Sequence, residues 1–313
     1  MGQTEALADC EGNHSFEMVW SSRAEGRQPH GASRLSGPGA ASHEGTMSRV
    51  RVPAVAGSFY PADPSRLVQQ VDGWLSGAST SEEARPAALI VPHAGYIYSG
   101  PVAASAYAHL RALKGSVSRV LLLGPCHFVP LRGLAHPDAD VLQTPLGTVN
   151  VDSELRERAE ATGLVSGSVD AHRREHSLEV QLPFLQRALG TFSVLPLVVG
   201  RASPEQVASV LEALWTEDVL PVISSDLSHY LPYAQARQVD QETAEQVVAL
   251  EGPLDGERAC GASAINGLLL TARRRGLRPR LLDLRSSGDT AGDKSRVVGY
   301  GAFALYPAQE ARA

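Results

Sequence analysis

Short runs of apolar residues, each closed by proline, glycine or a polar turn, recur along most of the chain. Residues 87–91, 120–123, 192–199 and 220–224 are such runs, and charged side chains are absent from them. Uninterrupted apolar runs of this length predict strands that are buried on both faces, as in a parallel sheet. Residues 134–151 contain several turn signals and are expected to be irregular or β structure.

Helical spacing of apolar residues appears between these strands. Residues 64–77 carry apolar side chains at helical spacing and end in glycine, which predicts a helix. Further helices are expected over residues 102–113, 152–162, 177–189, 204–215, 234–250 and 261–275. Pro183 is expected to kink its helix or to mark the first turns. Residues 280–284 and 297–306 are predicted strands, and the alternating character of the second indicates a half-exposed or edge position.

Strands and helices alternate from residue 47 to residue 307. This order predicts one α/β domain with three layers, in which helices cover both faces of a mostly parallel sheet. Residues 1–46 are rich in Gly, Ser, Ala and His and lack periodicity, so we expect them to be disordered or to be an extension upstream of a true start at Met47. Residues 308–313 are expected to form a short tail.

Composition narrows the classes of function. Apolar residues make up 43% of the 313-residue chain and charged residues 20%, which is typical of a globular protein with a large core. The net charge of −6 argues against nucleic-acid binding, and no apolar run approaches the roughly 20 residues that a membrane span needs. Three cysteines are too few for a disulfide framework and favour a reducing, cytoplasmic setting. No phosphate-binding glycine motif follows a strand.

Three of the predicted buried strands run directly into loops that carry a histidine. These histidines are His93, His127 and His229, and Asp226 precedes the last of them by three residues. Because the carboxyl ends of parallel strands share one edge of the sheet, we expect the four side chains to converge there. Asp226 and His229 are expected on an opening helical turn, where the carboxylate either orients the imidazole or joins it in binding a metal. The alternative for His93 is a histidine that is hydrogen-bonded inside a tight turn, and the alternative for Asp226 and His229 is an N-cap aspartate with a surface histidine.

Two further segments carry candidate chemistry. Glu175 and His176 begin a predicted helix, where acidic residues also favour the helix dipole without any catalytic role. Cys260 stands just ahead of another predicted helix, a position that lowers a thiol pKa and suits a nucleophile or a soft metal ligand. The alternative for Cys260, as for Cys126, is a small buried apolar residue.

Taken together, these segments resemble the Memo family, which includes protein B of the AmmeMemoRadiSam system and the eukaryotic mediator of cell motility. The matching stretches are AGSFYP (56–61), PHAGYIYSG (92–100), GPCH (124–127), TPLG (144–147), EHSLEVQLPFL (175–185), SSDLSHY (224–230), CG (260–261) and SGDTAGDKSRVVGYGAFAL (287–305). The resemblance implies a fold similar to the class III extradiol dioxygenases (LigB-like). It also implies an iron or copper ion held by His93, His127 and Cys260.

The same resemblance implies a common pocket for the remaining candidates. Asp226 and His229 would lie beside the metal, as would Glu175 and His176. Partners implied by the family are the AMMECR-type and radical-SAM proteins of the same system, besides an unknown small molecule. The chain departs from the family pattern at Phe128, where members often carry a second histidine, and at Cys126, where they often carry serine. A disulfide between Cys126 and Cys260 would expel the metal.

Three functions are consistent with these residues. The first is a metal-dependent redox or dioxygenase-like enzyme, with His229 as acid and base and Asp226 as its orienting group. The second is a protein that binds copper or iron, or a partner, without turnover. The third is a hydrolase with Cys260 as nucleophile, in which His93 and His127 would have no task.

Overall fold

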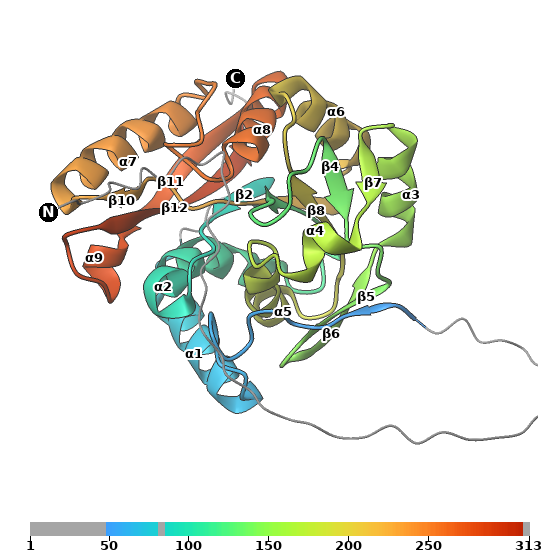
Figure 1. Cartoon of the computed structure of the whole chain (residues 1–313), viewed down its shortest axis with the longest axis horizontal. Coiled ribbons are helices and arrows are strands. Elements are labelled where there is room, and N and C mark those ends of the chain that lie inside the picture. The colour runs from blue at the N-terminus through green and yellow to red at the C-terminus, as the bar shows by residue number, and fades with distance from the viewer. Residues whose placement is uncertain (1–47, 81–84, 309–313) are drawn as a thin grey trace, which may run out of the picture. The chain divides into compact units, whose positions relative to one another are not determined.

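The computed structural model describes residues 48–80 and 85–308. The predicted extension 1–46 and most of the predicted tail lie outside these residues. The described residues form one mixed sheet with helices on both of its faces (Figure 1). Its strands are β1 Val50–Arg51, β2 Ala88–Val91, β3 Arg119–Pro125, β4 Leu134–His136, β5 Val141–Thr144, β6 Gly147–Val151, β7 Val165–Gly167, β8 Ser193–Val199, β9 Val219–Ser224, β10 His229–Leu231, β11 Leu277–Ser286 and β12 Val297–Pro307.

The centre of the sheet is parallel. Its strands follow the order β6-β8-β3-β9-β2, and every neighbouring pair in that series is parallel. Strands β2 and β9 are buried at every position, and β3 at all positions after its first. The prediction of buried parallel strands from uninterrupted apolar runs is therefore confirmed. An α/β fold with a mostly parallel sheet places the loops after these strands on one edge.

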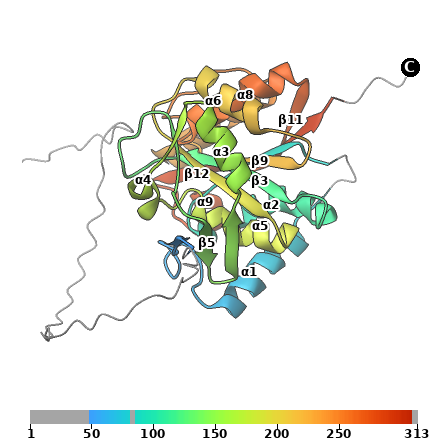
Figure 2. The ribbon, with the colours of Figure 1, turned by 90° about the vertical axis from the view of Figure 1, so that its right-hand side faces the viewer.

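Helices cover the sheet from two sides. The α-helices are α1 Pro64–Gly77, α2 Tyr96–Tyr107, α3 Ser153–Ala161, α4 Val169–Arg173, α5 Leu182–Leu189, α6 Pro204–Leu214, α7 Tyr233–Val248, α8 Ala262–Arg274 and α9 Ser287–Thr290. Short 3-10 helices span Ala108–Leu113 and Glu179–Gln181. Helices α3, α6 and α8 lie on one face, and α1, α2 and α5 on the other (Figure 2). No helix of residues 48–80 and 85–308 is long and apolar enough to cross a membrane.

Helix α1 shows how the local sequence defines an element. Asp63 caps its first turn by accepting the backbone N–H of Arg66, and Pro64 begins the helix. Both features favour a helix start, because they satisfy or remove N–H groups that have no partner within the helix. The apolar residues Leu67 and Val71 are fully buried. The predicted bounds of this helix are confirmed.

The prediction for the last strand was wrong. Strand β12 lies inside the sheet, antiparallel to β2 on one side and to β11 on the other, and nearly all of its residues are buried. Its alternation is between large and small side chains rather than between buried and exposed ones. At Gly299 the backbone lies against helix α7, so that a Cβ would come within 2.0 Å of Asp240 Oδ2. A small residue on this strand therefore marks a close helix contact rather than solvent.

Two helices begin at other residues than predicted. Helix α2 begins at Tyr96, six residues before the predicted start, and carries Pro101 in its interior. The proline removes only the hydrogen bond to the carbonyl of Ile97, a residue that is 59% exposed and so open to water. The helix predicted from residue 177 begins as a 3-10 turn and becomes α-helical at Leu182, with Pro183 in its first turn.

Candidate metal centre

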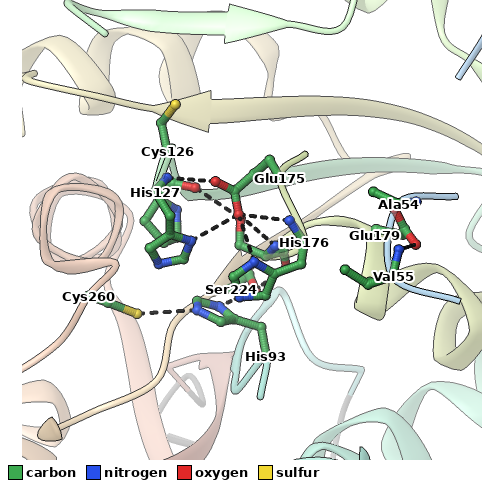
Figure 3. Close-up of polar contacts among 12 residues, drawn as sticks. Ala54, Val55, His93, Cys126, His127, Glu175, His176, Glu179, Ser224 and Cys260 are labelled. Atoms are coloured by element: carbon green, nitrogen blue, oxygen red, sulfur yellow. Dashed lines mark hydrogen bonds and ion pairs between the residues drawn. The ribbon is translucent and has the colours of Figure 1, made fainter. Parts of the chain in front are cut away.

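Three neighbouring parallel strands deliver the predicted residues to one edge of the sheet. His93 follows β2, His127 follows β3, and Asp226 follows β9, which lies between the other two strands. The His93 side chain is 2% exposed, whereas that of His127 is 29% exposed and forms the open side of the group. Cys260 enters from the loop ahead of α8 (Figure 3).

The imidazoles of His93 and His127 and the thiol of Cys260 share one small space. Each residue offers one ligand atom, and these three atoms lie within 4.8 Å of one another. His93 Nε2 lies 3.3 Å from Cys260 Sγ. Two imidazole nitrogens and one thiolate are donors that suit zinc, copper and iron.

Cys260 reaches this space because the chain passes very close to the end of β9. The backbone N–H of Gly261 donates to Ser225 Oγ at 2.9 Å, and a Cβ on Gly261 would lie 2.7 Å from the Cβ of Ser225. Only glycine tolerates such an approach without displacing the neighbouring strand end. The backbone N–H of Asp226 then donates to Cys260 Sγ at 3.3 Å.

Glu175 orients the ring of His127. Its carboxylate lies 2.9 Å from His127 Nδ1 and also accepts the backbone N–H of His127 at 2.6 Å. An ionised carboxylate only accepts, so His127 Nδ1 carries a proton, and Nε2 is the ring atom that could bind a metal after losing its own proton. Burial alone would raise the pKa of Glu175, but the hydrogen bonds from His127 hold that pKa well below its usual range. Burial alone would lower the pKa of His127, but its bonds to Cys260 and Glu175 hold that pKa well above its usual value.

The surroundings of Cys260 favour its thiolate form. Burial would raise its pKa, but the neighbouring charge of His93 and the hydrogen bonds from both imidazoles lower the pKa to about 6. Near neutral pH the sulfur is therefore ionised in the metal-free protein, and the thiolate is the form that binds metals.

Asp226 and His229 lie close to this space but are arranged differently from the prediction. Asp226 Oδ1 accepts the backbone N–H of His93 at 2.7 Å, and no hydrogen bond among residues 48–80 and 85–308 joins Asp226 to His229. The predicted helical turn is wrong: His229 begins strand β10, because the backbone of Leu227 and its neighbours pairs with β12 at Gly299. His229 Nδ1 is buried, and the ring lies near the backbone of Leu227.

His176 forms a wall of the site. Its ring stacks on that of His127 with centroids 4.9 Å apart, and lies edge-on to that of His93 at 5.6 Å. Burial, followed by the charge of His93, lowers the pKa of His176 to about 3, so the ring is neutral at physiological pH. His127, Glu175 and His176 also lie close enough to suggest a second metal group. The Glu175 carboxylate argues against it, because it already accepts four N–H groups, about its full capacity.

Sequence reasoning missed two polar residues beneath His93. Ser224 Oγ lies 2.9 Å from His93 Nδ1, and Gln181 Nε2 donates to that same Ser224 oxygen at 2.8 Å. The available signal was a serine at the end of an apolar strand and a glutamine within the apolar run VQLPFL. Both residues are buried, with at most 1% of their surface exposed.

Glu179 is a third missed residue, and it connects the site to the entry segment of the domain. Its buried carboxylate accepts the backbone N–H groups of Ala54 and Val55 (Figure 3). It also accepts the hydroxyl of Tyr60. It also pairs with Arg51 at 2.7 Å. Glu179 thus holds strand β1 and the following turn against the loop that carries Glu175.

The two described cysteines are free thiols that point apart. Cys126 Sγ donates to the carbonyl of Val129 at 3.3 Å, and Figure 3 shows its side chain directed away from Cys260. This arrangement does not favour the disulfide between them that the sequence suggested. Phe128, at the position where a histidine is often found, lies with its ring 6.0 Å from that of His176.

Comparison with known proteins gives a consistent match. The sequence model of the family described as Memo-like protein matches residues 51–304. A MEMO1 family protein of Sulfolobus acidocaldarius is 38% identical over 80% of this chain and 97% of that protein. One from Aquifex aeolicus is 39% identical over 80% of this chain and 97% of that protein. The crystal structure of an uncharacterized Escherichia coli K12 protein is 14% identical, with a TM-score of 0.43 over 69% of this chain and 99% of that chain.

Proposed function

The chain belongs to the Memo family, and from this premise we propose that it binds one metal ion through His93, His127 and Cys260. Iron(II) and copper(I) are the ions that we favour, because a thiolate beside two imidazoles suits borderline and soft metals. We further propose that the bound ion serves redox chemistry, in a fold related to the class III extradiol dioxygenases. That last relationship is an analogy of fold and motif.

One observation carries the proposal. Each histidine has its Nδ1 atom beside a protein group, Ser224 Oγ for His93 and the Glu175 carboxylate for His127, both at 2.9 Å. Their Nε2 atoms are therefore left to meet the thiolate of Cys260. Metal-binding histidines are commonly held in this way, with the second nitrogen bonded to a carboxylate or another protein acceptor. The donor set fits a metal without rearrangement of the hydrogen bonds around it.

A bound iron or copper ion would supply a centre that changes oxidation state and polarises a ligand. The surrounding side chains would handle protons. Burial lowers the pKa values of both His176 and His229, so each is a neutral imidazole that can accept or return a proton. Asp226 would position the His93 loop through its backbone N–H.

Metal binding without turnover is the second function that we keep. The exposed side of His127 would allow an ion to enter and leave, as storage or delivery requires. A cysteine hydrolase is less consistent with the contacts, because the thiolate of Cys260 is hydrogen-bonded to His93 and His127 rather than to His229. In a hydrolase, both of these imidazoles would crowd the nucleophilic sulfur without having a role in the reaction.

The test is anaerobic loading of the purified protein with iron(II) or copper(I), followed by metal analysis. We expect one ion per chain, and a loss of most of it in His93→Ala, His127→Ala and Cys260→Ser. Cys126→Ser is the matched control, because this thiol points away from the site. Full stoichiometry in any of the three ligand variants would refute that ligand. Oxygen consumption by the loaded protein would then separate redox turnover from storage.

Partners and compartment form a separate part of the proposal. The site needs reduced cysteine, so we propose a reducing compartment such as the cytoplasm. We also propose that the protein works with AMMECR-type and radical-SAM proteins of the same system, and with an unknown small molecule. Co-purification from the native host of such proteins with this chain is the test, and their consistent absence from the complex would count against it.

A further inference from the structure

We propose that Ser224 and Gln181 are positioning residues that select the tautomer of His93 in which Nδ1 carries the proton. This inference rests on the proposed metal centre, because its consequence is that Nε2, and not Nδ1, is the nitrogen of His93 that binds the ion. A buried series of hydrogen bonds runs from Tyr107 through Gln181 and Ser224 to His93.

The orientation of the Gln181 amide comes first. Gln181 Nε2 donates to the carbonyl of Pro92 at 2.9 Å and to Ser224 Oγ at 2.8 Å. A carbonyl oxygen can only accept, so the nitrogen, not the oxygen, must face Pro92. Tyr107 supports the same orientation, since its hydroxyl donates to Gln181 Oε1 at 2.9 Å. Both protons of the amide nitrogen are then in use, one of them on Ser224.

The single proton of the Ser224 hydroxyl is also in use. Ser224 Oγ donates to the backbone carbonyl of Ser177 at 2.6 Å. The direction of this hydrogen bond is fixed, because a carbonyl oxygen can only accept. With its proton given to Ser177 and one lone pair taken by Gln181, the hydroxyl has one lone pair left. His93 Nδ1 lies 2.9 Å away and must therefore be the donor.

The opposite tautomer would leave buried groups unsatisfied. Ser224 and Tyr107 are fully buried, Gln181 is 1% exposed and His93 is 2% exposed, so water cannot replace a lost partner. If His93 Nδ1 were unprotonated, it would face the lone pair of Ser224, or Ser224 would have to abandon Ser177. All of these buried hydrogen bonds are therefore satisfied only when His93 Nδ1 carries a proton.

His93 and His127 both have Nδ1 hydrogen-bonded to a protein group, but the two groups differ in charge. His127 uses the carboxylate of Glu175, whereas His93 uses a hydroxyl within a network that has no charged member. The neutral network meets His93 at Nδ1, whereas the Asp226 carboxylate lies 4.0 Å from Nε2 on the other side of the ring.

The experiment measures zinc(II) affinity, because zinc is a diamagnetic probe that binds the same donor types. Competition with a chelator should show a 10–100-fold loss for Ser224→Ala, the effect typical of removing a partner of a metal-bound histidine. Gln181→Met should lose less, under tenfold, because Ser224 still accepts from His93. In the zinc-loaded wild type, the His93 Nδ1 proton should be visible by NMR and protected from solvent exchange, and Ser224→Ala should lose that protection.

Thr271→Val is the control for a buried hydroxyl, since Thr271 is fully buried and bonds only within helix α8. It should leave zinc affinity unchanged even if it lowers the melting temperature. Unchanged affinity and an equally protected His93 proton in Ser224→Ala would overturn the inference, as would a larger loss in Gln181→Met than in Ser224→Ala. Failure of the wild type to bind zinc, iron or copper would instead refute the proposed metal centre.

Discussion

Asp240 of helix α7 offers a test of the electrostatics of the fold away from the candidate centre. Its side chain is buried, with 3% of the residue exposed, and it accepts the backbone N–H of Ser228 at 3.0 Å. No salt bridge to this carboxylate exists among residues 48–80 and 85–308. Burial raises the pKa of Asp240 from 3.8 to about 6. We predict that Asp240→Asn stabilises the protein at neutral pH and not at pH 4.

The sign follows from the raised pKa. A group that binds its proton more tightly in the folded state contributes its full stability below pH 3.8 and loses it as the pH rises through about 6. At about 1.4 kcal/mol per pKa unit, ionised Asp240 costs the folded state up to about 3 kcal/mol at pH 7 and above. Asparagine keeps an acceptor for Ser228 and cannot ionise. For a domain of this size the gain corresponds to a melting temperature about 5–10 °C higher.

The assay is the unfolding midpoint of wild type and Asp240→Asn at intervals from pH 4 to pH 8. The difference between the two should be small at pH 4, grow between pH 5 and pH 7, and then level off. Asp170→Asn, which changes a carboxylate that is 73% exposed, is the control and should alter stability little. A difference that stays constant with pH, or that favours the wild type at pH 7, would refute the reasoning.

Three further predictions concern the site and its support. In the metal-free protein, iodoacetamide should label Cys260 with a pH midpoint near 6. Cys126 should be labelled only at higher pH, because burial raises its pKa. Mass spectrometry of the two peptides measures both rates, and anaerobic metal loading should protect Cys260 alone. Glu179→Gln should lower the unfolding free energy by about 3–5 kcal/mol, because it leaves the charge of Arg51 buried without its partner; denaturant unfolding tests this, and a loss below 1 kcal/mol would contradict it. Glu175→Gln should weaken zinc binding about 10–100-fold in a chelator competition, because an amide cannot accept all four N–H groups; wild-type affinity would contradict it.

Much of the fold followed from local pattern. Uninterrupted apolar runs identified β2, β3, β8 and β9 as buried strands, because only strands covered on both faces lack alternation. Caps, prolines and helical spacing identified α1 and α6 within one residue of their ends. The convergence of the histidine loops also followed, since parallel strands carry their carboxyl ends to one edge whatever their order in the sheet.

Other features depended on contacts between distant residues, which a local pattern does not contain. The interior position of β12 comes from its pairing with β2 and β11, and helix α7 covers it at Gly299. Asp226 pairs with the loop of His93 rather than with His229 three residues away, because β9 and β2 are neighbours.

The chemical state of the candidate centre was decided only by tertiary structure. The sequence by itself supplied the residue types, two imidazoles and a thiol, and placed them at strand and helix ends. Which nitrogen of each histidine faces Cys260 depends on Glu175 and Ser224, which meet these rings from other segments of the chain. A hydrogen bond is specific to distance and direction, so its partners are determined once the packed strands and loops have set the positions of both groups.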